Sequence, residues 1–240
     1  TERESEDKFV METKVLSDTS VGIEYKGEAL LSRTRYYWSV EVWNKDGVAL
    51  DTTSSWFEMG LLNSSDWSAK RIGITDATSA EMLRRSFNVT GEVKSARLYS
   101  TALGLYEASI NGQKVGNDYL NPGWTDYRYR VQYQTFDITN MLAEGENVIG
   151  VMLGNGFVNC SAGWVWEFDK ALFRSAPSFA LELVCGDTVV ESDTSFKTAP
   201  SPITFDDYRY GEHYDATLEF DGWNTIDFDD SSWQNALVAP

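Results

Sequence analysis

The spacing of the apolar residues constrains the fold of this chain more than any other feature. They recur at every second position in short runs, and turn residues separate the runs. Residues 34–44 show the pattern, and their apolar face comprises Tyr36, Trp38, Val40 and Val42. Side chains of a strand point alternately to its two faces, so the pattern predicts strands. The 3.6-residue period of long amphipathic helices is missing from the sequence, so an all-β fold is expected.

Residues 1–62 are predicted to be the C-terminal part of a fibronectin-III-like sandwich. The run at 34–44 would be one strand, and residues 55–62 would return after the turn at 44–47. Residues 20–27 read as a further strand. These strands are too few to close a sandwich, so we expect an open edge and earlier strands upstream.

Residues 63–240 are predicted to form a jelly-roll, galactose-binding-like β-sandwich. Turns separate strand-like runs at 81–89, 95–112, 131–139, 147–156, 178–192 and 195–200. Asn111 and Gly112 suit a tight hairpin turn, which needs positive φ angles. We expect Asp137 or Thr139 to cap a short helical turn that ends at Gly145 and precedes a strand.

Composition excludes several classes of partner. Asp and Glu number 37 against 20 Lys and Arg, a net charge of −17 that repels nucleic acid and anionic membranes. No apolar run reaches the about 18 residues that suggest a membrane span. The charged N-terminal residues lack the apolar core of a signal peptide, and the compartment stays open because a longer parent could be exported.

Cysteine and histidine limit the chemistry further. His213 is the one histidine, which argues against His-based triads and multi-His metal sites. Cys160 and Cys185 have no zinc-binding spacing, and two free thiols or one disulfide fit the sequence equally well.

Specific motifs connect the strand pattern to a known family. The stretch "LYEASINGQKVGNDYLNPGWTDYRYRVQYQTFDIT" and the later "NVIGVMLGNGF" closely resemble the N-terminal β-sandwich region of bacterial α-L-rhamnosidases of glycoside hydrolase family 78. "SSWFEMGLLNSSDWSAKRIG" resembles the junction after that family's fibronectin-like domain. "FDDYRYGEHYDATLEFDGWNTIDFDDSSW" resembles its segment leading to the catalytic domain.

The resemblance implies a division of labour within a longer protein. The family hydrolyses terminal α-L-rhamnosyl residues by inversion, with a general acid and a general base on a downstream (α/α)6 barrel. It therefore implies that this chain contains no catalytic residue and is an accessory portion of the enzyme.

The resemblance also implies a metal site for sugar. Some members hold rhamnose on this sandwich through calcium, and Asn117, Asp118 and Asn155 match the positions of the ligands. Calcium takes about six to eight oxygen ligands, and Asp118 is the one charged ligand here, so weak affinity is expected.

Aromatic residues give a second carbohydrate-binding candidate. Trp164 and Trp166 could stack on sugar rings, or they could be buried or face the barrel. Phe157 stands where the family usually has tryptophan. The aromatic residues of the stretch 117–139 are expected to pack a sandwich face: Tyr119, Trp124, Tyr127, Tyr129, Tyr133 and Phe136.

The acidic segment near the C-terminus is expected to be a solvated loop or an edge of a site or domain seam. Its acids surround His213 and are Asp206, Asp207, Glu212 and Asp215. The favoured function is thus an accessory fragment of a rhamnosidase. The alternatives are a calcium-dependent rhamnose-binding module and a structural spacer that supports the barrel and forms homodimers.

Overall fold

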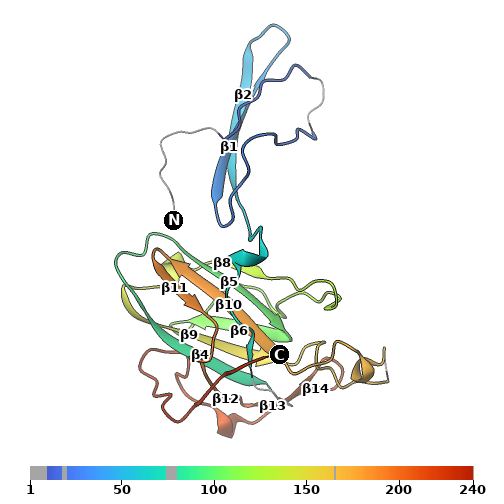
Figure 1. The fold of residues 1–240 in the computed structure, drawn as a ribbon, viewed down its shortest axis with the longest axis vertical. Helices are drawn as coiled ribbons and strands as arrows, with labels where there is room; N and C mark the ends of the chain where they lie inside the picture. Colours follow the sequence, from blue (N-terminus) through green and yellow to red (C-terminus); the bar gives the residue numbers. More distant parts are fainter. Residues whose placement is uncertain (1–9, 18–20, 74–79, 165, 240) are drawn as a thin grey trace. The chain divides into compact units, whose positions relative to one another are not determined.

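A computed structural model describes residues 10–17, 21–73, 80–164 and 166–239 of the chain. The chain divides into two compact units, Glu2–Trp67 and Ser68–Pro240. Strands dominate both units, and the helical pieces among the described residues are single 3-10 turns (Figure 1). None of these turns is long or apolar enough to cross a membrane. The prediction of an all-β fold is confirmed.

The first unit is built around an antiparallel hairpin. Strand β1 (Arg35–Trp43) pairs with β2 (Ala49–Glu58), and Arg35 lies 3.2 Å from Glu58 in an ion pair across them. The turn forms as predicted, with the Asn44 N–H donating to the carbonyl of Val48 at 2.9 Å. The single-turn helix η1 (Ser64–Asp66) follows.

The hairpin leaves large apolar side chains in solvent. Tyr37 is 69% exposed and Trp56 is 52% exposed. The prediction of a strand at 20–27 is wrong for the described residues 21–27, which form no ladder. Their apolar residues alternate, but the side chains of Val21 and Ile23 are 76% and 67% exposed, so burial does not fix this segment as a strand.

The second unit consists mainly of two antiparallel six-stranded sheets (Figure 1). The first follows the order β16-β3-β10-β5-β8 with β11 beside β10, and its members are β16 (Leu237–Val238), β3 (Ile72–Gly73), β10 (Ser178–Cys185), β5 (Ala96–Leu103), β8 (Gln134–Asp137) and β11 (Thr188–Glu191). The second follows the order β15 (Gln234–Asn235), β12 (Lys197–Pro200), β4 (Glu81–Val89), β9 (Gly145–Gly154), β6 (Leu105–Ile110) and β7 (Gln113–Lys114). A separate hairpin pairs β13 (Ile203–Asp207) with β14 (Gly211–Tyr214).

The core of this unit lies between the two sheets. Leu83 of β4 and Val151 of β9 belong to the same buried cluster as Leu98 of β5 and Leu181 of β10. All four are 0% exposed. Burial of such side chains from both sheets is the main stabilising contribution of a sandwich.

Local turn chemistry follows the sequence in the second unit. Asn111 and Gly112 have φ angles of 49° and 82°, as the β6–β7 hairpin requires. A single helical turn, η2 (Thr139–Met141), precedes β9, and Asp137 accepts from the N–H of Thr139 at 3.1 Å. The rest of the prediction for this turn is wrong, because its N-cap residue is Ile138 and it ends at Met141. Gly145, with a φ of 95°, is instead the first residue of β9.

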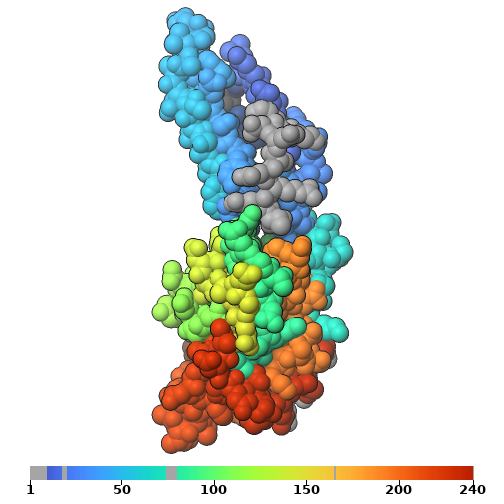
Figure 2. Space-filling model, turned by 90° about the vertical axis from the view of Figure 1, so that its left-hand side faces the viewer, coloured from blue at the N-terminus to red at the C-terminus, as the bar shows by residue number. Residues whose placement is uncertain are grey.

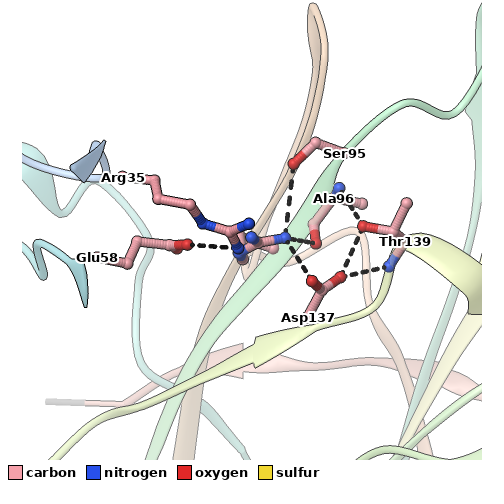
Figure 3. A network of polar contacts seen from close by, with 7 residues as sticks. Arg35, Glu58, Ser95, Ala96, Asp137 and Thr139 are labelled. Carbon is pink, nitrogen blue, oxygen red and sulfur yellow. Dashed lines mark hydrogen bonds and ion pairs between the residues drawn. The ribbon is translucent and has the colours of Figure 1, made fainter. Parts of the chain in front are cut away.

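Arg97 ties β5 to β8 at the start of this helical turn. Figure 3 labels the neighbouring residues Ala96, Asp137 and Thr139 of this network. Its guanidinium lies 3.1 Å from the carboxylate of Asp137 and donates to the carbonyl of Ala96 at 3.0 Å. The hydroxyl of Thr139 donates to Asp137 at 2.6 Å and accepts from the N–H of Ala96 at 3.0 Å. This network fixes the end of β8 against β5.

The segment after β14 covers one part of the second sheet. It includes the helical turn η4 (Ala216–Leu218), and Figure 2 shows it in orange-red as one continuous mass. Asp230 pairs with Arg84 of β4, whose guanidinium is buried and donates to the carbonyl of Thr225 at 3.0 Å. Trp233 is 6% exposed, and its ring lies 5.5 Å from that of Phe228, so it anchors the segment.

The structure decides the state of the two cysteines and the placement of the aromatic residues of 117–139. Cys160 and Cys185 are free and buried, so they form no disulfide. The aromatic residues of 117–139 mostly do not pack a sandwich face, because only β8 is a strand there. Tyr119 is 79% exposed, Tyr129 is 83% exposed and Trp124 is 53% exposed.

Candidate functional site

Three loop segments meet in the second unit, and most of the candidate residues belong to them. The segments are the approach to β8 (121–133), the connection from β9 to β10 (155–177) and the β13–β14 hairpin. The first contacts the second through Trp124 and Phe157, whose ring centroids are 5.4 Å apart. The second is hydrogen-bonded to the third through Asn155 and Asp206. Residues far apart in sequence thus form one surface.

Asn155, directly after β9, is fixed by Asp206 of β13. The backbone N–H of Asn155 donates to one carboxylate oxygen at 2.7 Å, and its side-chain amide donates to the other at 2.7 Å. The Asn155 amide oxygen accepts from Asn159 at 2.7 Å. With 3% exposure, this side chain is held inside the loop packing.

The neighbouring Asp207 joins the same two segments. One of its oxygens accepts from the N–H of Ser161 at 2.7 Å and from the Ser161 hydroxyl at 2.8 Å. The other accepts from the N–H of Arg209 at 2.8 Å and of Tyr210 at 3.2 Å. A single buried carboxylate therefore shapes the β13–β14 turn and holds it against the β9–β10 connection.

The pKa values of Asp206 and Asp207 are shifted in opposite directions. Burial raises the pKa of Asp206, and the charges of Glu212 and Asp207 add to this against the hydrogen bonds from Asn155. Burial also acts to raise the pKa of Asp207, but the donors from Arg209 and Ser161 outweigh it and hold that pKa below its ordinary value. Asp207 is therefore an ionised anchor at neutral pH.

A chain of aromatic rings crosses the three segments. Phe157 stacks on Tyr208 with centroids 4.0 Å apart and lies 5.2 Å from Phe168, which contacts Trp166 at 5.7 Å. We call these rings, together with the neighbouring Trp164, the aromatic surface. Its members are Trp124, Phe157, Trp164, Trp166, Phe168 and Tyr208. Within it, Phe157 supports Trp124 and Phe168 supports Trp166.

The outer rings of the aromatic surface are open to solvent. Trp164 is 68% exposed and Trp166 is 70% exposed, so the alternative that they are buried is wrong. The guanidinium carbon of Arg209 lies 4.7 Å from the ring centroid of Trp166 and 5.9 Å from that of Trp164. Trp166 and Glu167 both have left-handed φ angles, of 59° and 50°, which bulky residues rarely adopt.

The candidate calcium ligands divide between two environments. Asn117 and Asp118 are exposed after Gly116, whereas Asn155 is buried. Both environments adjoin β6. Three residues after Asp118, the carbonyl of Asn121 accepts from the N–H of Tyr106 at 2.8 Å. On the other side of β6, Leu105 pairs with Gly154, the residue before Asn155.

The fit of this set to calcium is partial. The amide oxygen of Asn155 already accepts from Asn159, so it would have to share or exchange that partner to bind a cation. Within the described ranges, no group of three or more His, Cys, Asp or Glu side chains is placed to hold a metal ion. The calcium site stays a prediction.

The remaining acids of the segment have local roles. Glu212 is exposed on β14 opposite Asp206. Asp215 accepts from the N–H of Thr217 at 2.9 Å and so caps η4. His213 is exposed, and its ring lies 5.1 Å from that of Phe205.

Sequence reasoning missed Phe168 and Tyr208 of the aromatic surface, and it missed Arg209, which lies over Trp166. The run "DDYRYGE" holds the signal: two carboxylates, then an arginine between tyrosines, then a glycine. That order suits a short turn presenting aromatic and cationic side chains. Only the structure shows that this turn meets Phe157 and Trp166.

The fold and this surface define an antiparallel β-sandwich protein with an exposed aromatic surface. Residues 91–240 match the family of the α-L-rhamnosidase N-terminal domain, and residues 2–63 match the Rha78A-like N-terminal immunoglobulin domain. The chain belongs to the α-L-rhamnosidase N-terminal domain family, in glycoside hydrolase family 78, as its sequence motifs predicted.

Individual relatives agree with this assignment. An α-L-rhamnosidase of Formosa agariphila is 34% identical over 248 residues, which cover 95% of this chain and 26% of the relative. The structure of α-L-rhamnosidase from Dictyoglomus thermophilum is 33% identical with a TM-score of 0.80, covering 91% of this chain and 26% of that one. The α-L-rhamnosidase from Aspergillus terreus is also 33% identical with a TM-score of 0.80, covering 88% and 26%. This chain thus spans about a quarter of the length of these proteins.

Proposed function

We propose that this chain is the N-terminal, non-catalytic part of an α-L-rhamnosidase, and that its aromatic surface contacts carbohydrate. One observation carries the second part: Trp164 and Trp166 are largely exposed, and the ring of Phe168 packs against that of Trp166. Exposed indole faces are costly in water, and they suit the C–H faces of sugars. Family membership supports rhamnosides as the sugar class.

In this proposal the whole protein hydrolyses terminal α-L-rhamnosyl residues on a downstream domain. A general acid and a general base there would act with inversion. The chain alone should not turn over p-nitrophenyl α-L-rhamnoside above a buffer blank. Turnover that a substitution in this chain abolishes would contradict the assignment. For the whole protein, NMR should show β-rhamnose as the first product, and the α anomer would exclude inversion.

The carbohydrate contact can be tested by titration calorimetry. L-rhamnose and a rhamnose-containing oligosaccharide are titrated into the chain and into its Trp166→Ala variant. We expect the variant to lose most of the binding, since stacking is the main contact. Tyr129→Ala is a matched control, because Tyr129 is exposed but outside the aromatic surface. Equal affinity of the two variants for the sugar would show that the carbohydrate site does not include Trp166.

A second candidate is a calcium-dependent rhamnose site at Asn117, Asp118 and Asn155. It is favoured because the segments that contain Asp118 and Asn155 both pair with β6 close to these residues. A cation there would polarise sugar hydroxyls while Asp118 offsets its charge. Rhamnose binding that a chelator removes and Asp118→Ala abolishes would support this site. We expect a Kd for calcium at the weak end of extracellular calcium modules, about 10⁻⁴ to 10⁻³ M. Binding that is unchanged in chelator would exclude it.

Failure of both titrations would support the third function, a structural spacer for the catalytic barrel. A spacer that forms homodimers would sediment as a dimer at micromolar concentration. A monomer would leave contact with the barrel as its role.

A further inference from the structure

We propose that the aromatic surface binds an acidic saccharide, with Arg209 as the residue that recognises its negative group. This inference rests on the proposed carbohydrate contact and adds the charge of the ligand to it. The ligand class is a sugar that presents an apolar C–H face to tryptophan and a carboxylate or sulfate group to a guanidinium.

The first observation is the state of the Arg209 side chain. It is exposed, its contacts are with the rings of Trp164 and Trp166, and the described residues give it no carboxylate partner. Among the other arginines of the unit, Arg84 is paired with Asp230 and Arg128 with Asp126 at 2.7 Å. Within the described ranges Arg130 and Arg174 have no carboxylate partner either, but only Arg209 lies over the two exposed tryptophans. In a chain with 37 acidic residues, a guanidinium without a carboxylate is available to a ligand.

The second observation is that the arginine is held in place before any ligand arrives. Its backbone N–H donates to Asp207, and Asp207 is bonded to Ser161. The rings of Trp164 and Trp166 support its side chain. A guanidinium over an aromatic face can direct its in-plane N–H groups outward, and two of them match the oxygens of a carboxylate or sulfate.

The negative charge of the whole chain bears on which ligands Arg209 and the aromatic surface can bind. A net charge of −17 repels anions, but salt largely screens the repulsion from charges more than about 8 Å away at physiological ionic strength. A contact with Arg209 is shorter than that distance. An anion without a sugar ring would lack the stacking contact, and a neutral sugar would lack the ion pair. The surface therefore favours ligands that have both.

The test uses the 240-residue chain and oligosaccharides of one skeleton. The probes are a rhamnose–glucuronic acid oligosaccharide, its carboxyl-reduced neutral form, and a sulfated rhamnose oligosaccharide. Each is titrated by calorimetry into the wild type and into Arg209→Gln. We expect the acidic probe to bind about tenfold more tightly than its reduced form, as one charge-assisted contact allows, and Arg209→Gln to remove this difference. The sulfated probe shows whether sulfate replaces carboxylate.

A matched control is Arg128→Gln, which removes an exposed guanidinium that already has its own carboxylate. It should leave all affinities unchanged. Equal binding of the acidic and reduced probes, or an acid preference that persists in Arg209→Gln, would overturn the inference while the carbohydrate contact stands. Failure of all probes to bind would refute both. A thermal melt of Arg209→Gln verifies that the variant is folded.

Discussion

Asp207→Ala should destabilise the second unit, because one carboxylate supplies four acceptor contacts. Its donors are the N–H and hydroxyl of Ser161 and the N–H groups of Arg209 and Tyr210. Asp207 itself is 7% exposed. Alanine offers none of these acceptors, so the β13–β14 turn would separate from the β9–β10 connection unless water enters.

The magnitude follows from the donors that are left. Each hydrogen bond to a charged group contributes about 1.5–3 kcal/mol to stability when both partners are buried. Ser161, Arg209 and Tyr210 are exposed residues, so water can replace part of each lost contact. We therefore expect a loss of roughly 2–4 kcal/mol, within the range known for broken polar networks. For a unit of this size, 1 kcal/mol shifts Tm by about 2–4 °C, so Tm should fall by roughly 4–16 °C.

The assay is thermal unfolding followed by near-UV circular dichroism at several pH values. The pKa of Asp207 is lowered in the folded chain, so its stabilisation is complete above the ordinary aspartate pKa of about 4. It is lost as the pH falls through the lowered pKa, so the Tm gap between wild type and variant should narrow in acid. Asp187→Ala, at an exposed turn, should change Tm little. An unchanged Tm at pH 7, or a gap that does not narrow in acid, would refute the reasoning.

Three further outcomes are expected. Asp230→Ala should cost about 3–5 kcal/mol in chemical denaturation, since it leaves the buried guanidinium of Arg84 without its carboxylate, and a cost under about 1 kcal/mol would contradict this. Gly116→Ala should cost roughly 1–3 kcal/mol, because its φ is 70° and a Cβ would lie 2.6 Å from a ring atom of β8; equal Tm values would count against the strain. Hydrogen exchange should be faster in the β1–β2 hairpin than in β4 and β9, because no third strand joins the hairpin among the described residues and its side chains are mostly exposed. Equal protection would contradict that expectation.

The fold was largely predictable where local pattern and tertiary burial agree. Residues 81–89 were expected to be a strand, and β4 has these bounds. Asn111 and Gly112 were expected in a tight turn, and their φ angles are positive. In both places the sequence within a few residues decides the structure: alternation in one and the tolerance of positive φ in the other.

The surface was less predictable because its contacts are long-range. Phe157 and Tyr208 stack although they are far apart in the sequence, and neither segment has a periodic residue pattern that predicts the contact. The stretch 117–139 looked like core because aromatics are usually buried. Its exposed Tyr129 shows that composition alone cannot place a loop residue inside or outside. Trp164 and Trp166 were recognised as candidates, but their exposure needed the structure.

The same long-range contacts explain how a loop surface can be ready for a ligand. Ordering rotamer-rich side chains on binding costs about 0.5–1.5 kcal/mol each, so a flexible set of tryptophans would bind weakly. Here the cost is met during folding. Asp206 and Asp207 hold the loop segments, Phe168 supports Trp166, and Arg209 lies over the outer rings. Asp207→Ala should therefore weaken oligosaccharide binding as well as stability, although the carboxylate is buried beneath the surface. A variant with wild-type affinity and lowered Tm would show that the surface orders without this anchor.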